Sequence, residues 1–155
     1  MFRILHLSDI HIGDTYKEPK EIACKIASDL AQHGLGKIQC IVVTGDIFEG
    51  TVTYSDELVS LAVNFFEVLL REINYNQESL PIVKEDILFV PGNHDIIRIK
   101  EQSQRWDKYH SFLSKFYGTI PKFYKADDYS FLKTYNMHKI AFVGLNSCQI
   151  EQKKH

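Results

Sequence analysis

Three short apolar runs, separated by two segments with helical periodicity, constrain most strongly what this chain can fold into. The runs "FRILHLS", "IQCIVVTGD" and "DILFVPGNHD" have the length of strands, and the second is rich in β-branched residues. An alternation of strand and helix is typical of a layered α/β domain with a largely parallel sheet. In such sheets the chemistry gathers beyond the carboxyl ends of the strands. We therefore expect functional residues where these runs end.

The first helical segment covers residues 18–34. It spaces Ile22, Ile26 and Leu30 every four residues and closes on Gly34. This pattern predicts an amphipathic helix whose apolar face holds the three large side chains and whose C-terminus is capped by glycine.

The second helical segment runs from Ser55 to residue 73, and Ser55 stands before Asp56 and Glu57 as a helix-capping residue does. A third helix is expected over residues 101–116, with Trp106, Tyr109, His110 and Leu113 on its apolar side. The aromatic side chains of this segment are either core or a platform on which bases stack; they are Trp106, Tyr109, Phe112 and Phe116.

The end of the chain adds little more than two strands. "YSFLKTY" and "KIAFVGLNS" are expected as strands that could pair with each other, and "CQIEQKKH" is polar and too short for another element. The predicted fold class is therefore a layered α/β fold that is incomplete, with a first sheet, its helices and the start of a second sheet.

The composition limits the domain size and the cellular compartment that can be expected for the protein. A chain of 155 residues that is 45% hydrophobic is long enough for one globular domain. No apolar run approaches the ~18 residues that span a bilayer, so no membrane partner is expected. Arg3, His6 and Asp9 interrupt the first apolar run, which argues against a secretory signal; His6 is expected to be packed. The three cysteines lie far apart, which favours a reducing, cytoplasmic setting.

Charge is distributed unevenly along the chain. Residues 1–97 have a balance of -8 and residues 98–155 a balance of +6. A basic half can attract phosphates, as in a nucleic acid or a nucleotide. Alternatively, the lysines of this half are ordinary surface on a helix and a loop; the residues in question are Lys108, Lys115, Lys122 and Lys125.

Polar side chains of the kind that bind metals follow all three apolar runs. Carboxylate, imidazole and amide oxygen suit divalent Mn, Fe or Zn. A carboxylate on the middle run could bridge two ions, which can share a hydroxide and hold a phosphoryl group for in-line displacement. One such ending could be turn chemistry, but three at one sheet edge converge. The residues are Asp9 and His11 in "SDIH", Asp46 and Glu49 in "TGDIFEG", and Asn93, His94 and Asp95 in "PGNHD".

The motifs "DIH", "GDIFE" and "GNHD", in this order, resemble the first three motifs of the calcineurin-like metallophosphoesterase superfamily, over Phe2 to about Ser147. The resemblance implies an α/β sandwich and a dinuclear-metal-dependent hydrolase of phosphoester bonds, in which a metal-activated hydroxide attacks phosphorus in line. It also implies that Asp9 and His11 hold the first metal, that Asp46 bridges, and that Asn93 binds the second.

The same resemblance assigns the catalytic residues. His94 would stabilise the transition state at the phosphate and donate a proton to the leaving oxygen, and Asp95 would orient the His94 imidazole. Glu49 stands where the family often has Asp. Glu49 and Asn146, which follows the last strand, are candidates for contact with the substrate.

The sequence departs from the family after the third motif. A lone histidine and a Gly-His-x-His turn, which complete both metal shells, have no match here. His110 lies in an expected helix, His138 precedes a strand, and His155 ends the chain. We therefore expect residues 1–155 to be the N-terminal part of a metallophosphoesterase domain, with further domains beyond His155 and a weak second metal site.

Three functions remain open at this point. The first is a phosphodiesterase or phosphatase with a phosphoester substrate. The second is a DNA-end nuclease of the repair-nuclease branch. The third is a non-catalytic binding or assembly module, because the metal site is incomplete in this chain.

Overall fold

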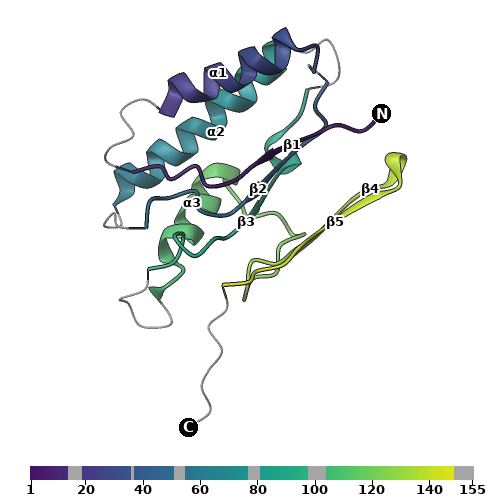
Figure 1. Cartoon of the computed structure of the whole chain (residues 1–155). Helices are drawn as coiled ribbons and strands as arrows, with labels where there is room; N and C mark the ends of the chain where they lie inside the picture. Colours follow the sequence, from purple (N-terminus) through teal and green to yellow (C-terminus); the bar gives the residue numbers. More distant parts are fainter. Residues whose placement is uncertain (14–18, 36, 51–54, 77–80, 98–103, 149–155) are drawn as a thin grey trace.

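The computed structural model describes residues 1–13, 19–35, 37–50, 55–76, 81–97 and 104–148 (Figure 1). The strands form a parallel sheet of order β1-β2-β3 and a separate antiparallel β4-β5 hairpin, as the sequence predicts for a layered α/β fold. The strands are β1 (Ile4–Leu7), β2 (Cys40–Thr44), β3 (Ile87–Val90), β4 (Phe131–Tyr135) and β5 (Ile140–Gly144); the helices are α1 (Pro19–Gln32), α2 (Asp56–Asn76) and α3 (Asp107–Tyr117); short 3-10 turns occupy η1 (Lys84–Asp86) and η3 (Asn136–His138).

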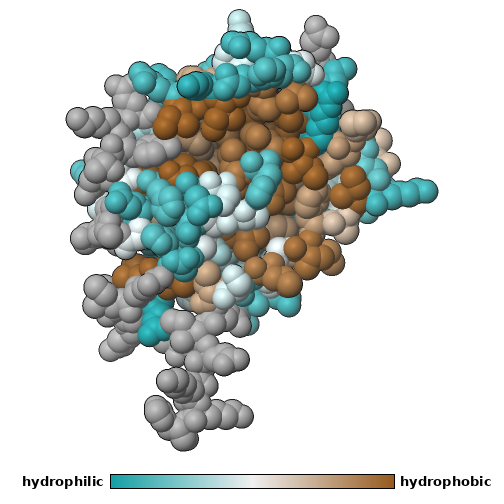
Figure 2. All heavy atoms as spheres, in the orientation of Figure 1, coloured by the Kyte–Doolittle hydropathy of each residue, from teal (hydrophilic) through white to brown (hydrophobic). Residues whose placement is uncertain are grey.

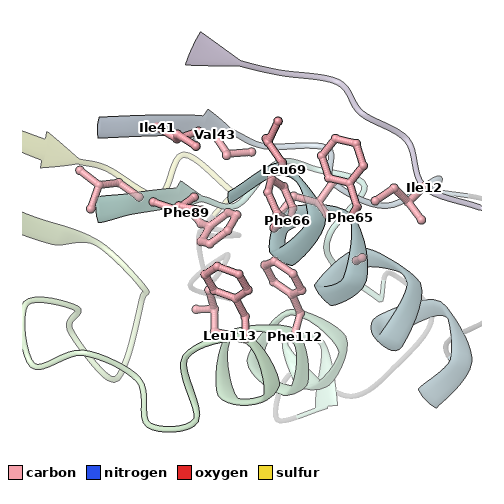
Figure 3. Close-up of a cluster of buried hydrophobic side chains, with 14 of the residues drawn as sticks. Ile12, Ile41, Val43, Phe65, Phe66, Leu69, Phe89, Phe112 and Leu113 are labelled. Atoms are coloured by element: carbon pink, nitrogen blue, oxygen red, sulfur yellow. The ribbon is translucent and has the colours of Figure 1, made fainter. Parts of the chain in front are cut away.

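The helices cover one face of the sheet, and an aromatic core fills the space beneath them. Phe89 of β3 packs edge-to-face against Phe66 of α2 and Phe112 of α3, with ring centroids 4.8 and 5.0 Å apart. Ile41 and Val43 of β2 point toward the same cluster (Figure 3). The β4-β5 hairpin lies on the other side of the sheet from α1 and α2 (Figure 1).

The capping signals of two helices are confirmed. The Ser55 hydroxyl accepts a hydrogen bond from the Leu58 N–H at 3.1 Å at the start of α2, which runs to Asn76. Gly34 follows α1 with a φ of 64°, and the Leu35 N–H donates to the Leu30 carbonyl at 2.9 Å. This hydrogen bond between the first and sixth residues of a turn is the one that a left-handed glycine permits at a helix end.

The predicted apolar face of α1 is confirmed in part. Ile26 and Leu30 are partly buried and pack against the core, but Ile22 is 41% exposed, and the buried positions facing α2 are Ala23 and Ala27. Small side chains let the two helix backbones approach closely, so the larger aliphatic residues are left at the margins of the contact. His6 is also exposed instead of packed, and its Nε2 lies 2.7 Å from the Thr44 hydroxyl across the β1-β2 pair.

The third helix is shorter than predicted. Residues 98–103 lie outside the described residues, and α3 itself begins at Asp107 instead of residue 101. Trp106 precedes it with helical backbone angles and makes no capping hydrogen bond through its side chain, so no capping signal marked this boundary.

The face of the sheet opposite the helices is only partly covered. Val42, Thr44 and Val90 border a pocket of about 1020 Å³, and the hairpin supplies Phe142 and Val143 to its other wall. Figure 2 shows apolar side chains gathered across the middle of the molecule, over β1 and toward the hairpin. Among the described residues, no helix is long and apolar enough to cross a membrane.

Candidate metal centre

The chain segments after β1 and β2 stay hydrogen-bonded beyond the ends of the strands. The Asp9 N–H donates to the Gly45 carbonyl at 3.3 Å, and the His11 N–H donates to the Asp46 carbonyl at 3.0 Å. Ile12 then pairs in parallel with Phe48. This extension of the strand pairing places Asp9 and His11 beside Asp46, as the convergence of strand ends predicted.

All three of these residues have left-handed backbone. The φ angles are 54° for Asp9, 52° for His11 and 52° for Asp46, and the neighbouring Gly45 has 88°. Left-handed backbone costs an L-residue roughly 1–2 kcal/mol, and Asp and His are among the residues that tolerate it best. Such strain collects at functional sites because a surrounding structure must hold it.

The three side chains offer atoms that can hold one cation. One ligand atom from each of Asp9, His11 and Asp46 lies within 4.8 Å of the other two. Ligands at about 2.0–2.2 Å on a tetrahedral ion lie roughly 3.3–3.6 Å apart, so the three side chains would draw together by up to about 1.5 Å on binding an ion. With this adjustment the donor set fits a divalent metal.

Asp46 also contacts the loop after β3. Its Oδ1 accepts a hydrogen bond from the His94 N–H at 2.9 Å. A Cβ on Gly92 would lie 2.2 Å from the same oxygen, so only glycine fits there. Asp46 thus stands between the Asp9–His11 side and the third loop. Asn93 is exposed and borders the same pocket as Asp46; its predicted binding of a second ion stays a prediction.

Asp95 joins two loops and does not bond to the His94 ring. Its fully buried carboxylate accepts hydrogen bonds from the Gly92 N–H at 2.8 Å and the Phe48 N–H at 3.1 Å. Burial raises the pKa of Asp95 to about 6 even though these two bonds favour the carboxylate. The expected orientation of the imidazole by Asp95 has no hydrogen bond behind it in this structure: His94 Nδ1 is buried with no partner among the described residues.

The His94 ring is packed against other parts of the site instead. It lies edge-to-face with the His11 ring, with centroids 5.0 Å apart. A Cβ on Gly50 would lie 2.3 Å from His94 Nδ1, so the backbone at Gly50 borders the ring directly. No sequence pattern indicates this contact, because it depends on the path of the loop after β2.

The remaining candidate residues take structural places. The Asn146 side chain donates to the Asp128 carbonyl at 2.7 Å and accepts from the Cys148 N–H at 2.8 Å, which is the behaviour of a turn residue. The Glu49 N–H pairs with the Ile12 carbonyl at 3.0 Å, which holds the loop beside the metal group. Contact of Glu49 or Asn146 with a substrate stays a prediction.

The two downstream histidines among the described residues do not approach the site. His110 Nδ1 lies 3.1 Å from the Tyr129 hydroxyl, and the His138 ring packs on Phe2. Neither joins the Asp9, His11 and Asp46 group among the described residues, and His155 lies outside them.

Two expectations about the region after residue 98 can now be separated. Tyr109, Phe112 and Phe116 are fully buried, so they are core and cannot stack on bases, whereas Trp106 is partly exposed. Lys108 is not surface: it is 2% exposed, and its Nζ donates to the His94 carbonyl at 3.0 Å. Its spacing of four and eight residues from Phe112 and Phe116 placed it on the apolar side of the helix, a signal that the charge of lysine obscured.

Comparison with known proteins identifies the family. The family model described as calcineurin-like phosphoesterase matches residues 2–149, so the chain belongs to this family. The uncharacterized protein R555 of Acanthamoeba polyphaga mimivirus is 34% identical over 97 residues, which cover 59% of this chain and 6% of that protein. The chain therefore spans a small part of the length of this relative. No solved structure matches the chain significantly.

Proposed function

We propose that the chain carries the first metal-binding part of a dinuclear-metal-dependent phosphoester hydrolase of the phosphodiesterase or phosphatase type. The observation that carries the proposal is the convergence of Asp9, His11 and Asp46 at the carboxyl edge of the sheet in a member of a phosphoesterase family. The ligand set favours Mn, Fe or Zn.

The residues would divide the work as follows. Asp9 and His11 would hold the first ion, Asp46 would bridge, and Asn93 would hold the second. The ions, when bound, supply Lewis-acid activation of water and neutralise charge on the phosphoryl group. The His94 imidazole would donate a proton to the leaving oxygen.

The site as described also supports a second candidate, a non-catalytic binding module. Among the described residues, only one group of three His, Cys, Asp or Glu side chains has the spacing of a metal site. We propose that segments beyond His155 complete the second metal shell and that this chain alone binds its second ion weakly. We also propose a cytoplasmic location, in keeping with three free cysteines.

Metal binding is tested with a matched pair of histidine variants. His11→Asn removes a proposed ligand, whereas His138→Asn removes a histidine that packs on Phe2 and is not a member of the group. At a concentration of Mn²⁺ about ten times its dissociation constant, binding adds about 1.4 kcal/mol to the unfolding free energy. Thermal unfolding with and without Mn²⁺ should show this gain in wild type and His138→Asn but not in His11→Asn. An equal gain in all three would refute the site.

The reaction is tested with three substrates in the presence of Mn²⁺. Release of nitrophenol from bis(4-nitrophenyl) phosphate, but not from 4-nitrophenyl phosphate, indicates a phosphodiesterase; release from the mono-ester indicates a phosphatase. Degradation of linear DNA indicates the nuclease. Asp46→Asn should abolish whichever activity is found. Metal binding without turnover of any substrate favours the binding module.

A further inference from the structure

Lys108 is an unusual residue for the interior of this protein. It lies in the first turn of α3 and is 2% exposed, although lysine is almost never fully buried without a partner. Burial lowers the pKa of its ammonium, which shows that the position is unfavourable for a charge. A buried lysine that no core requires needs a reason in the contacts it makes.

The contacts of Lys108 all lead to the loops of the metal centre. Its Nζ donates to the backbone carbonyl of His94 at 3.0 Å and lies 4.9 Å from the centre of the Phe48 ring. The Phe48 N–H in turn donates to Asp95. In the described part of the chain, no carboxylate lies within 4.0 Å of the Lys108 ammonium. The buried Asp95 carboxylate attracts the ammonium at longer range, but this attraction offsets only part of the effect of burial on the Lys108 pKa.

His94 is thereby held from several sides. Asp46 Oδ1 accepts from its N–H at 2.9 Å, and Lys108 donates to its carbonyl. Its ring stands between the His11 ring and the backbone at Gly50. Both backbone polar groups of one residue are thus bound by side chains from distant parts of the chain, and the ring has little room to turn.

We propose that Lys108 is a positioning residue that fixes the backbone of His94, so that the imidazole stays in the slot between His11 and Gly50. This inference rests on the proposed function, in which His94 acts on the leaving group. Lys108 does not touch the reacting atoms. Its effect passes through the loop of residues 91–95, which it connects to α3.

The alternative is that Lys108 only anchors α3 to the rest of the fold. An anchor contributes to stability, and its loss leaves the geometry of His94 as it was. A positioning residue changes the chemical step and the environment of His94, even at temperatures where the protein is fully folded. The two roles therefore differ in kcat and in the spectrum of His94, while both lower stability.

The kinetic test compares three variants with wild type on the substrate that wild type hydrolyses. The assays contain Mn²⁺ and are run at a temperature well below the melting temperature of each protein. Lys108→Met keeps the apolar stem on Phe48 and removes the donor; Lys108→Arg keeps a donor. We expect Lys108→Met to lower kcat about 10-fold or more with KM within about twofold, since small misplacements of a reacting group are costly. Lys108→Arg should restore part of kcat. Leu113→Ala, in the core of the same helix (Figure 3), should destabilise α3 with kcat within about twofold of wild type.

A spectroscopic test decides the inference even if wild type hydrolyses nothing, an outcome that would count against the proposed function and not against the positioning of His94. In proteins labelled with ¹³C at histidine Cε1, the His94 signal is assigned by its loss in His94→Gln. Lys108→Met should shift or broaden the His94 signal and leave that of His138 in place, and Leu113→Ala should not.

Gly50→Ala provides an independent variant if Lys108→Met does not fold. Its new Cβ would meet the His94 ring, so it should shift the same signal and lower kcat. A His94 signal and a kcat both unchanged in Lys108→Met would overturn the proposal, as would equal changes in Lys108→Met and Leu113→Ala.

Discussion

The two faces of the three-stranded sheet are built from the same strands but are covered differently. On one face, Ile41, Val43 and Phe89 are fully buried beneath the helices. On the other, Val42 and Val90 are only partly buried and border the pocket of about 1020 Å³ beside the hairpin. Three helices cover the first face, whereas in the described part of the chain the second face is lined by the hairpin alone.

This difference predicts at which positions a substitution lowers the free energy of unfolding most and least. On the helix face, the aromatic rings pack edge-to-face and are buried. On the hairpin side, Val143 is 65% and Leu145 71% exposed. A substitution should therefore cost most beneath the helices and least on the outer hairpin, and four measurements can break or sharpen this contrast.

The largest effect is expected at Phe89. Phe89→Ala removes a ring that contacts Phe66, Phe112 and Phe116, and loss of a buried Phe costs about 3–5 kcal/mol. Urea unfolding followed by circular dichroism measures the loss. Leu132→Ala, at an exposed position on β4, is the control and should cost less than about 1 kcal/mol. Similar losses at both positions would remove the distinction between the faces.

The next effect depends on pH and concerns Asp95. Because burial raises its pKa from 3.8 to about 6, the unfolded chain loses this proton first as the pH rises. Its contribution to stability is therefore fully present below pH 3.8 and is lost as the pH rises to about 6, by up to about 3 kcal/mol. Relative to Asp95→Asn, metal-free wild type should lose stability between pH 4 and pH 7.

The control for this measurement is Asp29→Asn, at an exposed position on α1. The pH profile of wild type relative to Asp29→Asn should lack the fall. If wild type instead gains stability relative to Asp95→Asn over this range, the carboxylate is stabilised by its two backbone donors more than it is destabilised by burial.

A smaller effect should show how firmly the hairpin covers the sheet. The Tyr135 hydroxyl donates to Asp86 Oδ1 at 3.1 Å, so Tyr135→Phe should cost about 1 kcal/mol. Cys40 lies beneath this contact; it is buried, and burial raises the pKa of its thiol to about 11. Alkylation of Cys40 at pH 8 should be slow in wild type, with Cys24 as the internal reference. Faster alkylation in Tyr135→Phe would report opening of the hairpin, because loss of the Tyr135 hydroxyl by itself raises the pKa of the Cys40 thiol. Rapid alkylation of Cys40 in wild type would mean that the hairpin does not close this end.

The smallest effect is expected at Val143. Val143→Thr changes an exposed position on β5 and should alter the unfolding free energy by less than about 0.5 kcal/mol. The same substitution at the fully buried Val43 places a hydroxyl among apolar side chains and should cost about 1–3 kcal/mol. A cost at Val143 equal to that at Val43 would show that the hairpin face is as closed as the helix face.

Local signals in the sequence were sufficient for most of the elements. Short apolar runs marked the strands, Ser55 marked the start of α2, and Gly34 marked the end of α1. The convergence of Asp9, His11 and Asp46 followed from the rule that parallel strands end at one edge. Each of these inferences needed only neighbouring residues or the direction of the strands.

What could not be predicted depends on contacts between distant segments. Ala23 is buried in place of Ile22 because of how closely α1 approaches α2. The Asp95 carboxylate bonds to the Phe48 N–H, 47 residues away, and Gly50 borders the ring of His94. Neither hydrophobic periodicity nor a short motif predicts contacts between residues so far apart in the sequence.

The left-handed backbone at Asp9, His11 and Asp46 has a consequence for directed evolution. In metal-free buffer, a ligand group of two carboxylates held within 4.8 Å adds repulsion to this backbone strain. Asn in place of either Asp keeps tolerance for the backbone and removes a charge. A library sorted only for thermal resistance should therefore enrich Asn at positions 9 and 46 and erode the metal centre. Sorting in the presence of Mn²⁺ would retain the carboxylates.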